Sequence, residues 1–286
     1  MKQRKMWSWI FLSPTLALFL VFFAIPLGYT FYLSFFDANL FQSSFVGLGN
    51  YLSLVKSLLF RQVVWNTTKY FLFIIPVSIF LPLILALLIT EVPRFGSLFR
   101  AIFYLPVAIG GLVIASIWKW IFNPTYGLLN WLLSLVGVDK ISWLGDPNFS
   151  LVSISIVFVI ACALSNFTLI YCAAITSLSK ELIEAAKLDG AGTFQLVKSI
   201  VIPLLKPAVH YIALTSILTT FNIWAFPKLL TEGGPLHSSA SFGYWIYETG
   251  FVYQKYGLAS AQAVAMLFLT IGFGAVLLRN QYDLTS

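Results

Sequence analysis

The sequence predicts an all-α integral membrane protein with six transmembrane helices. Of its 286 residues, 59% are hydrophobic and only 9% are charged, which is too few charges to cover a soluble domain of this length. Crossing the hydrocarbon of a bilayer takes about 20 helical residues, and the chain contains six long apolar runs. The expected spans cover approximately residues 9–36, 69–90, 100–121, 151–178, 207–229 and 257–279.

The first apolar run follows a basic start, MKQRK, and could be mistaken for a secretory signal peptide. The run is much longer than the roughly 7–15 apolar residues of a signal peptide, and no A-x-A-like cleavage site follows it. We therefore expect it to be the first membrane helix.

The middle spans are bounded by polar and helix-breaking residues. Asp146 and Pro147 interrupt the apolar pattern, so the fourth span begins near Leu151. The amphipathic segment 127–138 is expected to lie along the membrane interface. No linker, low-complexity segment or repeat of about 20–50 residues divides the chain, which predicts a single transmembrane domain over residues 1–286.

Lysine and arginine predict the orientation of the chain. Of the 17 such residues, ten fall on the side that carries the N-terminus, the loops 91–100 and 180–206, and Arg279. The other seven are spread over longer segments on the opposite side. Because cytoplasmic loops are enriched in basic residues, we expect both termini and the loop 180–206 to be cytoplasmic.

The remaining polar residues argue against several classes of site. The net charge of +7 is distributed over all the loops, so lipid phosphate explains it better than nucleic acid does. Cys162 and Cys172 lie on different faces of the fourth span and are expected to be core residues. His210 and His237 have no Cys, Asp or Glu at ligand spacing, so we expect no metal site.

The loop 180–206 is the most charged continuous stretch of the chain. Glu181, Glu184, Ala185 and Leu188 recur at helical spacing and would share one face. Asp189-Gly190 favours a turn, and a second helix is expected over about 193–200. On periodicity alone, an ordinary interfacial loop is favoured over a surface for a partner protein.

A motif in this loop favours the partner. EAAKLDG, followed nine residues later by IVIP, resembles the EAA loop of permease subunits of binding-protein-dependent ABC importers. Ile202 stands where that family usually has Leu. The residues that match the family pattern are Glu184, Ala185, Ala186, Gly190, Ile200 and Pro203.

Other segments are similar to the carbohydrate branch of that family, which includes the maltose and glycerol-phosphate importer permeases. These segments include FVGLGNY at 45–51, WNTTKY at 65–70 and LLTEGGP at 229–235. The resemblance implies a type I ABC importer permease fold, with the loop 180–206 as its cytoplasmic coupling helix. It also implies that Glu184, Ala185, Ala186, Asp189 and Gly190 contact an ATPase subunit.

The resemblance implies the rest of the transporter as well. The expected partners are a second homologous permease subunit, two ATP-binding cassette subunits and an extracytoplasmic solute-binding protein. The chain contains no G-x-x-x-x-G-K-[ST] loop, so it is not expected to be an enzyme or to hold a cofactor. ATP and Mg²⁺ would bind to the partner ATPases, and the location would be the bacterial inner membrane.

The expected spans contain neutral hydrogen-bonding residues and almost no ionisable ones. Neutral donors, acceptors and aromatic rings suit a sugar or a polyol, although such residues also join helices to one another. Ser216 and Thr220 match positions that contact sugar in the family. The expected substrate path comprises Asn166, Ser216, Thr219, Thr220, Asn222 and Trp224.

Two other functions are compatible with a membrane protein of this composition. An autonomous carrier or channel for a neutral polar solute would need no ATPase, but ion coupling normally requires ionisable groups inside the membrane. A membrane-embedded enzyme acting on lipid-linked sugars would normally carry a catalytic cluster of carboxylates, His or Arg. The sequence displays neither a set of ionisable groups for ion coupling inside the spans nor such a catalytic cluster. An ATP-driven importer is therefore the preferred hypothesis.

Overall fold

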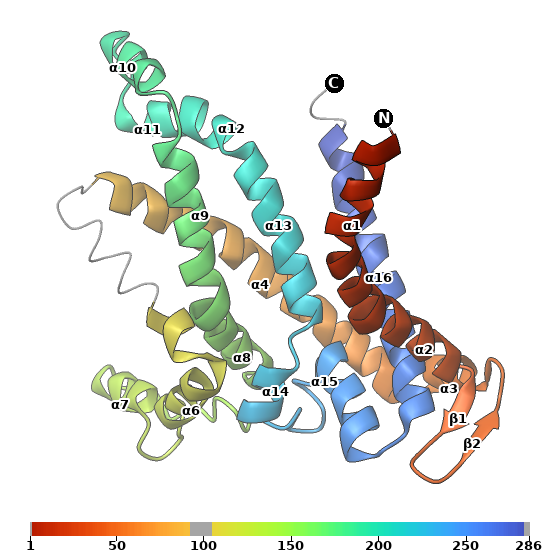
Figure 1. Ribbon diagram of the computed structural model, residues 1–286. Helices are drawn as coiled ribbons and strands as arrows, with labels where there is room; N and C mark the ends of the chain where they lie inside the picture. Colours follow the sequence, from red (N-terminus) through yellow and green to blue (C-terminus); the bar gives the residue numbers. More distant parts are fainter. Residues whose placement is uncertain (1, 92–104, 283–286) are drawn as a thin grey trace. The chain divides into compact units, whose positions relative to one another are not determined.

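The computed structural model describes residues 2–91 and 105–282, and most of the described chain is helical (Figure 1). The chain groups into two compact units, which are Met1–Arg61 with Trp245–Ile271, and Gln62–Tyr244 with Gly272–Ser286. Helices α4 (Leu58–Glu91) and α16 (Tyr256–Tyr282) continue from one unit into the other, so no linker separates the two.

The first unit contains the N-terminal helices and a small hairpin. Its elements are α1 (Lys2–Phe19), the π-helical turn η1 (Leu20–Ala24), α2 (Ile25–Leu33), β1 (Phe36–Ala38), β2 (Ser43–Phe45), α3 (Gly49–Lys56) and η4 (Glu248–Val252). The two strands pair antiparallel, with Phe36 opposite Phe45. This hairpin connects α2 to α3.

Asn50 holds the chain between α2 and the hairpin. Its side-chain amide is buried and donates hydrogen bonds to the carbonyls of Ser34 (2.9 Å) and Phe36 (2.8 Å). The neighbouring Tyr51 hydroxyl donates to the Ser34 hydroxyl at 2.7 Å. These bonds satisfy carbonyls where the helix has ended, which a chain near lipid cannot leave unpaired.

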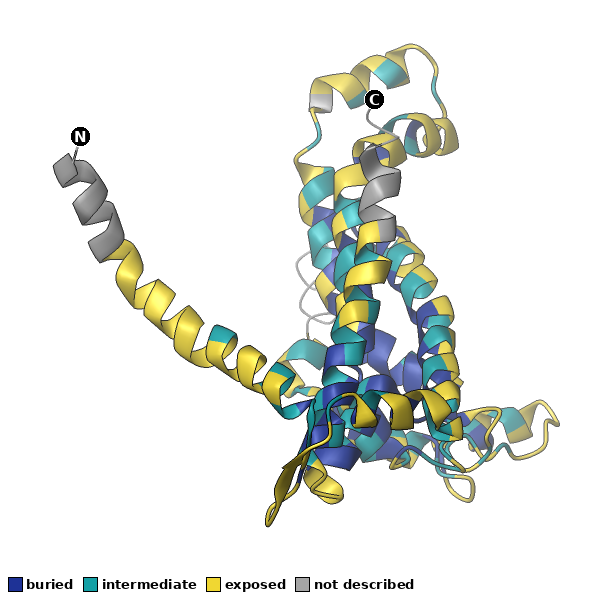
Figure 2. Cartoon of the chain, turned by 90° about the vertical axis from the view of Figure 1, so that its right-hand side faces the viewer, coloured by how far each residue is buried: buried dark blue, intermediate teal, exposed yellow. Residues whose placement is uncertain are grey.

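The first apolar helix makes little contact with its own chain. The stretch Phe11–Leu33 is long and apolar enough to span a membrane, yet 0% of its most apolar window is buried. Figure 2 shows this stretch as exposed along almost its whole length. An apolar helix of this kind needs lipid or another protein as its surroundings.

The second unit contains the remaining helices. They are α6 (Gly111–Ile121), α7 (Leu128–Leu135), α8 (Ser150–Phe158), η2 (Val159–Leu164), α9 (Ser165–Thr176), α10 (Lys180–Leu188), α11 (Thr193–Leu196), η3 (Val197–Val201), α12 (Ile202–Leu204), α13 (Lys206–Phe221) and α14 (Ala225–Leu230). Helix α15 (Phe242–Tyr247) follows and crosses the boundary between the units.

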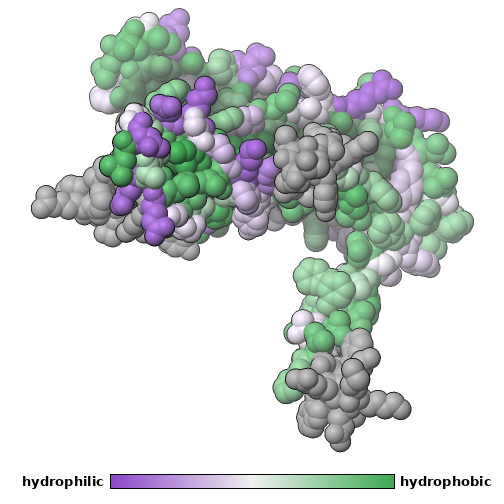
Figure 3. All heavy atoms as spheres, turned by 90° about the horizontal axis from the view of Figure 1, so that it is seen from above, coloured by the Kyte–Doolittle hydropathy of each residue, from purple (hydrophilic) through white to green (hydrophobic). Residues whose placement is uncertain are grey.

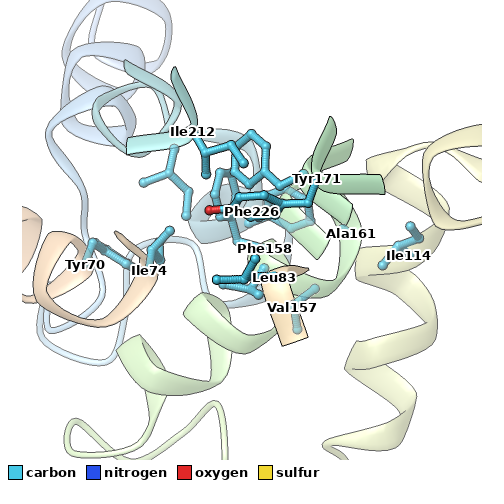
Figure 4. Close-up of a cluster of buried hydrophobic side chains, with 14 of the residues drawn as sticks. Tyr70, Ile74, Leu83, Ile114, Val157, Phe158, Ala161, Tyr171, Ile212 and Phe226 are labelled. Atoms are coloured by element: carbon cyan, nitrogen blue, oxygen red, sulfur yellow. The ribbon is translucent and has the colours of Figure 1, made fainter. Parts of the chain in front are cut away.

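The core of this unit lies where α4, α8, α9, α13 and α14 meet. Figure 4 shows Tyr171 and Ile212 close to Phe226 and Phe158 within this cluster. The Phe158 and Phe226 rings meet edge to face, with centroids 5.7 Å apart. Tyr70 and Ile74 of α4 are completely buried in the same cluster.

One face of α4 holds the loop that follows α14. The Gln62 amide donates to the Leu236 carbonyl (2.7 Å), and the Tyr70 hydroxyl donates to the Ser239 carbonyl (2.9 Å). Thr67 accepts from the backbone N–H of Phe242 at 3.1 Å. This irregular loop is therefore supplied with hydrogen bonds by side chains spaced along one helix.

Asn66 lies at the centre of that face. Its amide is 3% exposed and donates to the carbonyls of His237 (2.7 Å) and Ala240 (3.2 Å). Gly233, in the same loop, has φ = +76°, and a Cβ there would clash with the Tyr244 ring. The Asn-Thr segment of α4 and the Gly-Gly-Pro segment thus both serve to hold this loop in place.

Four described helices are long and apolar enough to cross a membrane, or five if the bent pair Thr193–Leu204 and Lys206–Phe221 is one span. The other four stretches are Phe11–Leu33, Leu58–Thr90, Ser150–Thr176 and Tyr256–Ala275. The expected third span, 100–121, begins outside the described residues, and α6 is its described apolar helix. Six spans therefore remain a prediction.

The fifth apolar helix differs from expectation. The sequence predicts a helix over 207–229, but α13 ends at Phe221, and residues 225–230 form the separate helix α14. The side chain of Asn222 turns back to the Leu218 carbonyl (3.1 Å), and Ser241 donates to the Ile223 carbonyl. These side-chain bonds replace helical ones and allow the chain to turn.

We predict that Asn66→Ala destabilises the protein. The change leaves two loop carbonyls without their donor, which typically costs about 2 kcal/mol in a buried setting. The thermal denaturation midpoint of the purified protein should fall clearly. Thr68→Val is the matched control, because Thr68 bonds only its own helix at the Val64 carbonyl (2.9 Å). Equal midpoints for the two variants would contradict the role given to Asn66.

Candidate functional sites

Helix α10 begins and ends with residues suited to each terminus. The Ser179 hydroxyl accepts from the backbone N–H of Leu182 at 3.4 Å, Glu181 lies in the first turn and Lys187 in the last. A hydroxyl cap and an acidic residue favour the positive helix start, and a basic residue favours the end. The short helix is therefore encoded locally, in the segment where the sequence predicts it.

The turn after α10 is a Schellman motif. The backbone N–H of Gly190 donates to the Lys187 carbonyl (3.1 Å), and that of Ala191 donates to the Ala186 carbonyl (3.0 Å). Gly190 has φ = +86°, a conformation in which an L-residue with a side chain is strained. The turn separates α10 from α11.

The outward face of α10 carries the residues that the sequence predicts to share a face. Glu181, Glu184 and Ala185 are exposed, and Leu188 is 88% exposed. Ala186, expected to contact a partner, is half-buried and packs against the core of its own unit. It lies on the other side of α10 because it follows Ala185 by about 100° around the helix.

Within the second unit, α10 and α11 lie at one end, and α6, α7 and α14 lie at the other (Figure 1). Figure 3 looks onto the end with α10 and shows hydrophilic side chains interspersed with hydrophobic ones. Asp189 and Gly190 are exposed there together with the carboxylates of α10. This end offers charged and apolar groups to a protein surface.

A second candidate site is a recess between the fourth and fifth apolar helices. It has a volume of about 450 Å³ and lies against η2, α9 and α13. Its lining combines aromatic rings, a thiol and neutral polar groups, and includes Phe158, Cys162, Asn166, Tyr211, Thr215 and Thr219. No charged side chain contributes to the described wall. Such a wall suits a neutral polar molecule.

Asn166 and Thr219 are the two predicted path residues that line this recess. The amide nitrogen of Asn166 donates to the Cys162 carbonyl (2.8 Å), and the Thr219 hydroxyl donates to the Thr215 carbonyl (2.9 Å). Both side chains are exposed. The Asn166 carbonyl oxygen and the Thr219 oxygen lone pairs can therefore accept hydrogen bonds from a ligand.

Ser216 and Thr220 do not line the recess. They are 1% and 0% exposed, and the Thr220 hydroxyl donates to the Ser216 carbonyl at 2.6 Å. Their shared face points into the protein because α13 packs on that side. Asn222 and Trp224 are exposed but follow the end of α13, and neither contributes to the recess wall.

Sequence reasoning missed Tyr211 and Thr215. Together with Thr219 they recur every four residues on α13, so helical spacing places them on one face. That spacing was available in the sequence, but it also fits Ser216 and Thr220 equally well. Only the packing of α13 distinguishes the face that lines the recess from the face that is buried.

Neither histidine lies in an arrangement typical of metal binding. The Nδ1 atom of His210 is 2.8 Å from the Lys206 carbonyl oxygen of its own helix, and the His237 carbonyl accepts from Asn66. Within the described residues, no three His, Cys, Asp or Glu side chains come together at metal-binding distance. The two sites above are therefore characterised by hydrogen bonding and surface charge.

Comparison with known proteins identifies relatives over nearly the whole chain. The probable ABC transporter permease protein YurN of Bacillus subtilis is 35% identical over 277 residues, which is 94% of each chain. The trehalose/maltose transport system permease protein MalF of Thermococcus litoralis is 30% identical over 95% of this chain and 92% of its own. The sn-glycerol-3-phosphate transport system permease protein UgpA of Escherichia coli is 29% identical over 94% of this chain and 92% of its own.

Solved structures have the same fold. A chain of a bacterial ABC transporter involved in the import of the acidic polysaccharide alginate superposes with a TM-score of 0.86 at 22% identity, covering 99% of this chain and 98% of that one. The family of binding-protein-dependent transport system inner membrane components matches residues 6–283. The chain belongs to this family and is a permease component of an ABC transporter rather than an enzyme.

Proposed function

We propose that the chain forms half of the translocation path of an ATP-driven importer for a neutral sugar or polyol. An extracytoplasmic binding protein delivers the solute, and a second homologous permease supplies the other half of the path. One of two ATP-binding cassette subunits docks on the loop 180–206, and closure of the ATPase pair drives alternating access. Family membership over residues 6–283 is the observation that carries this proposal.

The exposed face of α10 supports docking at this loop. Glu184 and Leu188 give a polar and an apolar group to a partner surface, and the small side chain of Ala185 allows close approach. The Schellman turn at Gly190 fixes where this face ends. Because the spans provide almost no ionisable groups for ion coupling, the energy for transport is best explained by a docked ATPase.

Two features support the arrangement of the complex. The positive-inside rule assigns α10 and both termini to the cytoplasmic side of a six-span chain. The stretch Phe11–Leu33 has no buried residues in its most apolar window, so a second permease subunit can cover part of this helix. The same helix would otherwise face lipid alone.

The lining of the recess supports a neutral sugar or polyol as the solute. Asn166 and Thr219 offer hydrogen bonds, while Tyr211 and Phe158 offer aromatic surface for the apolar face of a sugar ring. The names of MalF and UgpA include trehalose, maltose and sn-glycerol-3-phosphate. Phosphate recognition favours cationic side chains, and the recess wall has none, so we favour the neutral solutes.

We expect Glu184→Ala to weaken the association with the ATPase. Removing a central polar contact from a protein interface lowers affinity by roughly tenfold. The amount of ATPase subunit that co-purifies with the tagged permease measures this change. Asp139→Ala is the matched control, since Asp139 is an exposed carboxylate outside the loop 180–206. Undiminished ATPase recovery with Glu184→Ala would refute docking through this residue.

Gly190→Ala should disturb the same association through the backbone. An alanine at φ = +86° is strained by about 1–2 kcal/mol, so the end of α10 should unfold or rotate. Gly192→Ala is the control, because Gly192 has φ = −68° and open space around its Cβ position. Hydrogen exchange of residues 180–192 should accelerate only in Gly190→Ala. If both glycine variants exchange at the same rate as the unaltered protein, the turn does not set the position of α10.

Changes in the recess should lower the apparent affinity for solute. Asn166→Leu and Thr219→Val each remove a hydrogen-bonding group, which predicts a rise in the KM of uptake of about fivefold. Thr176→Val is the control, because Thr176 is an exposed residue of α9 that bonds its own helix at the Cys172 carbonyl (2.9 Å). Unchanged uptake by both recess variants would place the solute path elsewhere.

A further inference from the structure

A separate recess lies at the end of the second unit that is opposite to α10. Its volume is about 340 Å³, and it lies where the chain passes from α6 through α7 to the segment after it. Two tryptophans, a tyrosine, two hydroxyls and one cation dominate its wall, which includes Trp120, Thr125, Tyr126, Trp131, Ser134 and Lys140. Neither the proposed solute path nor the proposed ATPase contact uses these residues.

The walls of this recess are held in place by two asparagines. The Asn123 carboxamide oxygen accepts from the backbone N–H groups of Thr125 (2.9 Å) and Tyr126 (3.2 Å). Asn130 is 3% exposed and both donates to the Ile141 carbonyl (2.9 Å) and accepts from the Ile141 N–H (3.1 Å). These bonds fix Tyr126 on one wall and the segment with Lys140 on the other, so the recess is formed before any ligand binds.

The surroundings of the recess are apolar and exposed. Along α7 and its end, Leu132 is 46% exposed, Leu135 66% and Val136 74%. Trp120 and Trp131 are also more than half exposed. Tryptophan is enriched where a membrane protein meets the lipid headgroups, and a short amphipathic helix with such a face lies in the membrane interface. The recess therefore opens at the level of the headgroups.

The charge of the recess selects the ligand. Lys140 is its only charged lining residue in the described chain, and no carboxylate lines it. Asp139 precedes Lys140 but is exposed and does not contribute to the wall. A single ammonium group beside a hydroxyl attracts an anionic ligand and repels a cationic lipid headgroup.

We propose that this recess binds an anionic glycerophospholipid of the leaflet opposite to α10. Lys140 contacts the lipid phosphate, the Thr125 hydroxyl donates to a phosphate or glycerol oxygen, and the two tryptophans pack along the upper acyl chains. The proposal rests on membrane insertion of this family member and does not depend on which solute is transported. A soluble sugar would also stack on tryptophan, but it would not explain the lysine or the apolar surroundings.

Quenching of tryptophan fluorescence by brominated lipid tests this site. The complete transporter complex is reconstituted in nanodiscs of phosphatidylcholine that contain increasing fractions of brominated phosphatidylglycerol or of brominated phosphatidylcholine. We expect quenching at lower fractions of the anionic lipid, and we expect Trp131→Phe to remove part of this excess. Equal quenching by the two lipids would overturn the proposal.

Two lysine variants separate this site from general attraction to a negative membrane. Lys140→Gln should lower the apparent affinity for the anionic lipid by about fivefold, whereas Lys255→Gln, which changes a lysine outside the recess, should leave it unchanged. Equal effects of the two variants, or relief of quenching by a soluble oligosaccharide, would also overturn the proposed lipid site. ATPase activity of the same nanodiscs, measured in parallel, reports on the proposed transport function separately.

Discussion

Backbone hydrogen bonding at the ends of the helices is the constraint on which this structure depends. A buried carbonyl that is left unpaired cannot bond to water, so where the chain leaves a helix inside the protein its hydrogen-bond partner must come from the protein itself. Asn50, Asn66 and Asn130 are buried, and each amide donates to two backbone carbonyls of a non-helical segment. These three side chains thereby hold three of the connections between helices in place.

The same constraint explains where charge is found. Among the described buried polar residues, all but Glu248 carry neutral hydroxyl or amide groups, and the described core cluster of the second unit is hydrophobic. Charged residues can then concentrate on α10, where they face outward and are available to a partner. In the proposed function, the neutral recess would serve the solute and this separate charged surface would serve the source of energy. The proposed coupling of transport to ATP follows from this division.

Much of the helical architecture could be predicted from the sequence, because long apolar runs have few alternatives in a membrane protein. The position of α10 and the turn at Gly190 could be predicted as well, since caps and glycine act locally. The end of α13 at Phe221 could not be predicted, because the Ser241 hydroxyl that bonds the Ile223 carbonyl comes from a distant part of the sequence.

The recess shows what helical periodicity alone leaves undecided. Ser216 and Thr220 share one face of α13, and Thr215 and Thr219 share another, so periodicity alone gives no preference between them. The packing of α13 buries the first pair and leaves the second beside Asn166. The resemblance to other permeases favoured Ser216 and Thr220, so the assignment of this pair to the solute path stays a prediction.

Solute uptake into proteoliposomes is the most direct test of the central claim, which is that this chain transports a neutral polar solute only when an ATPase and a binding protein act on it. The complex is reconstituted with its binding protein, and uptake of labelled maltose, trehalose and glycerol is followed with and without ATP. The account predicts accumulation of a solute against its gradient only when ATP and the liganded binding protein are both present. Equilibration of solute by the chain alone, without ATP, would contradict it and would identify a carrier or channel.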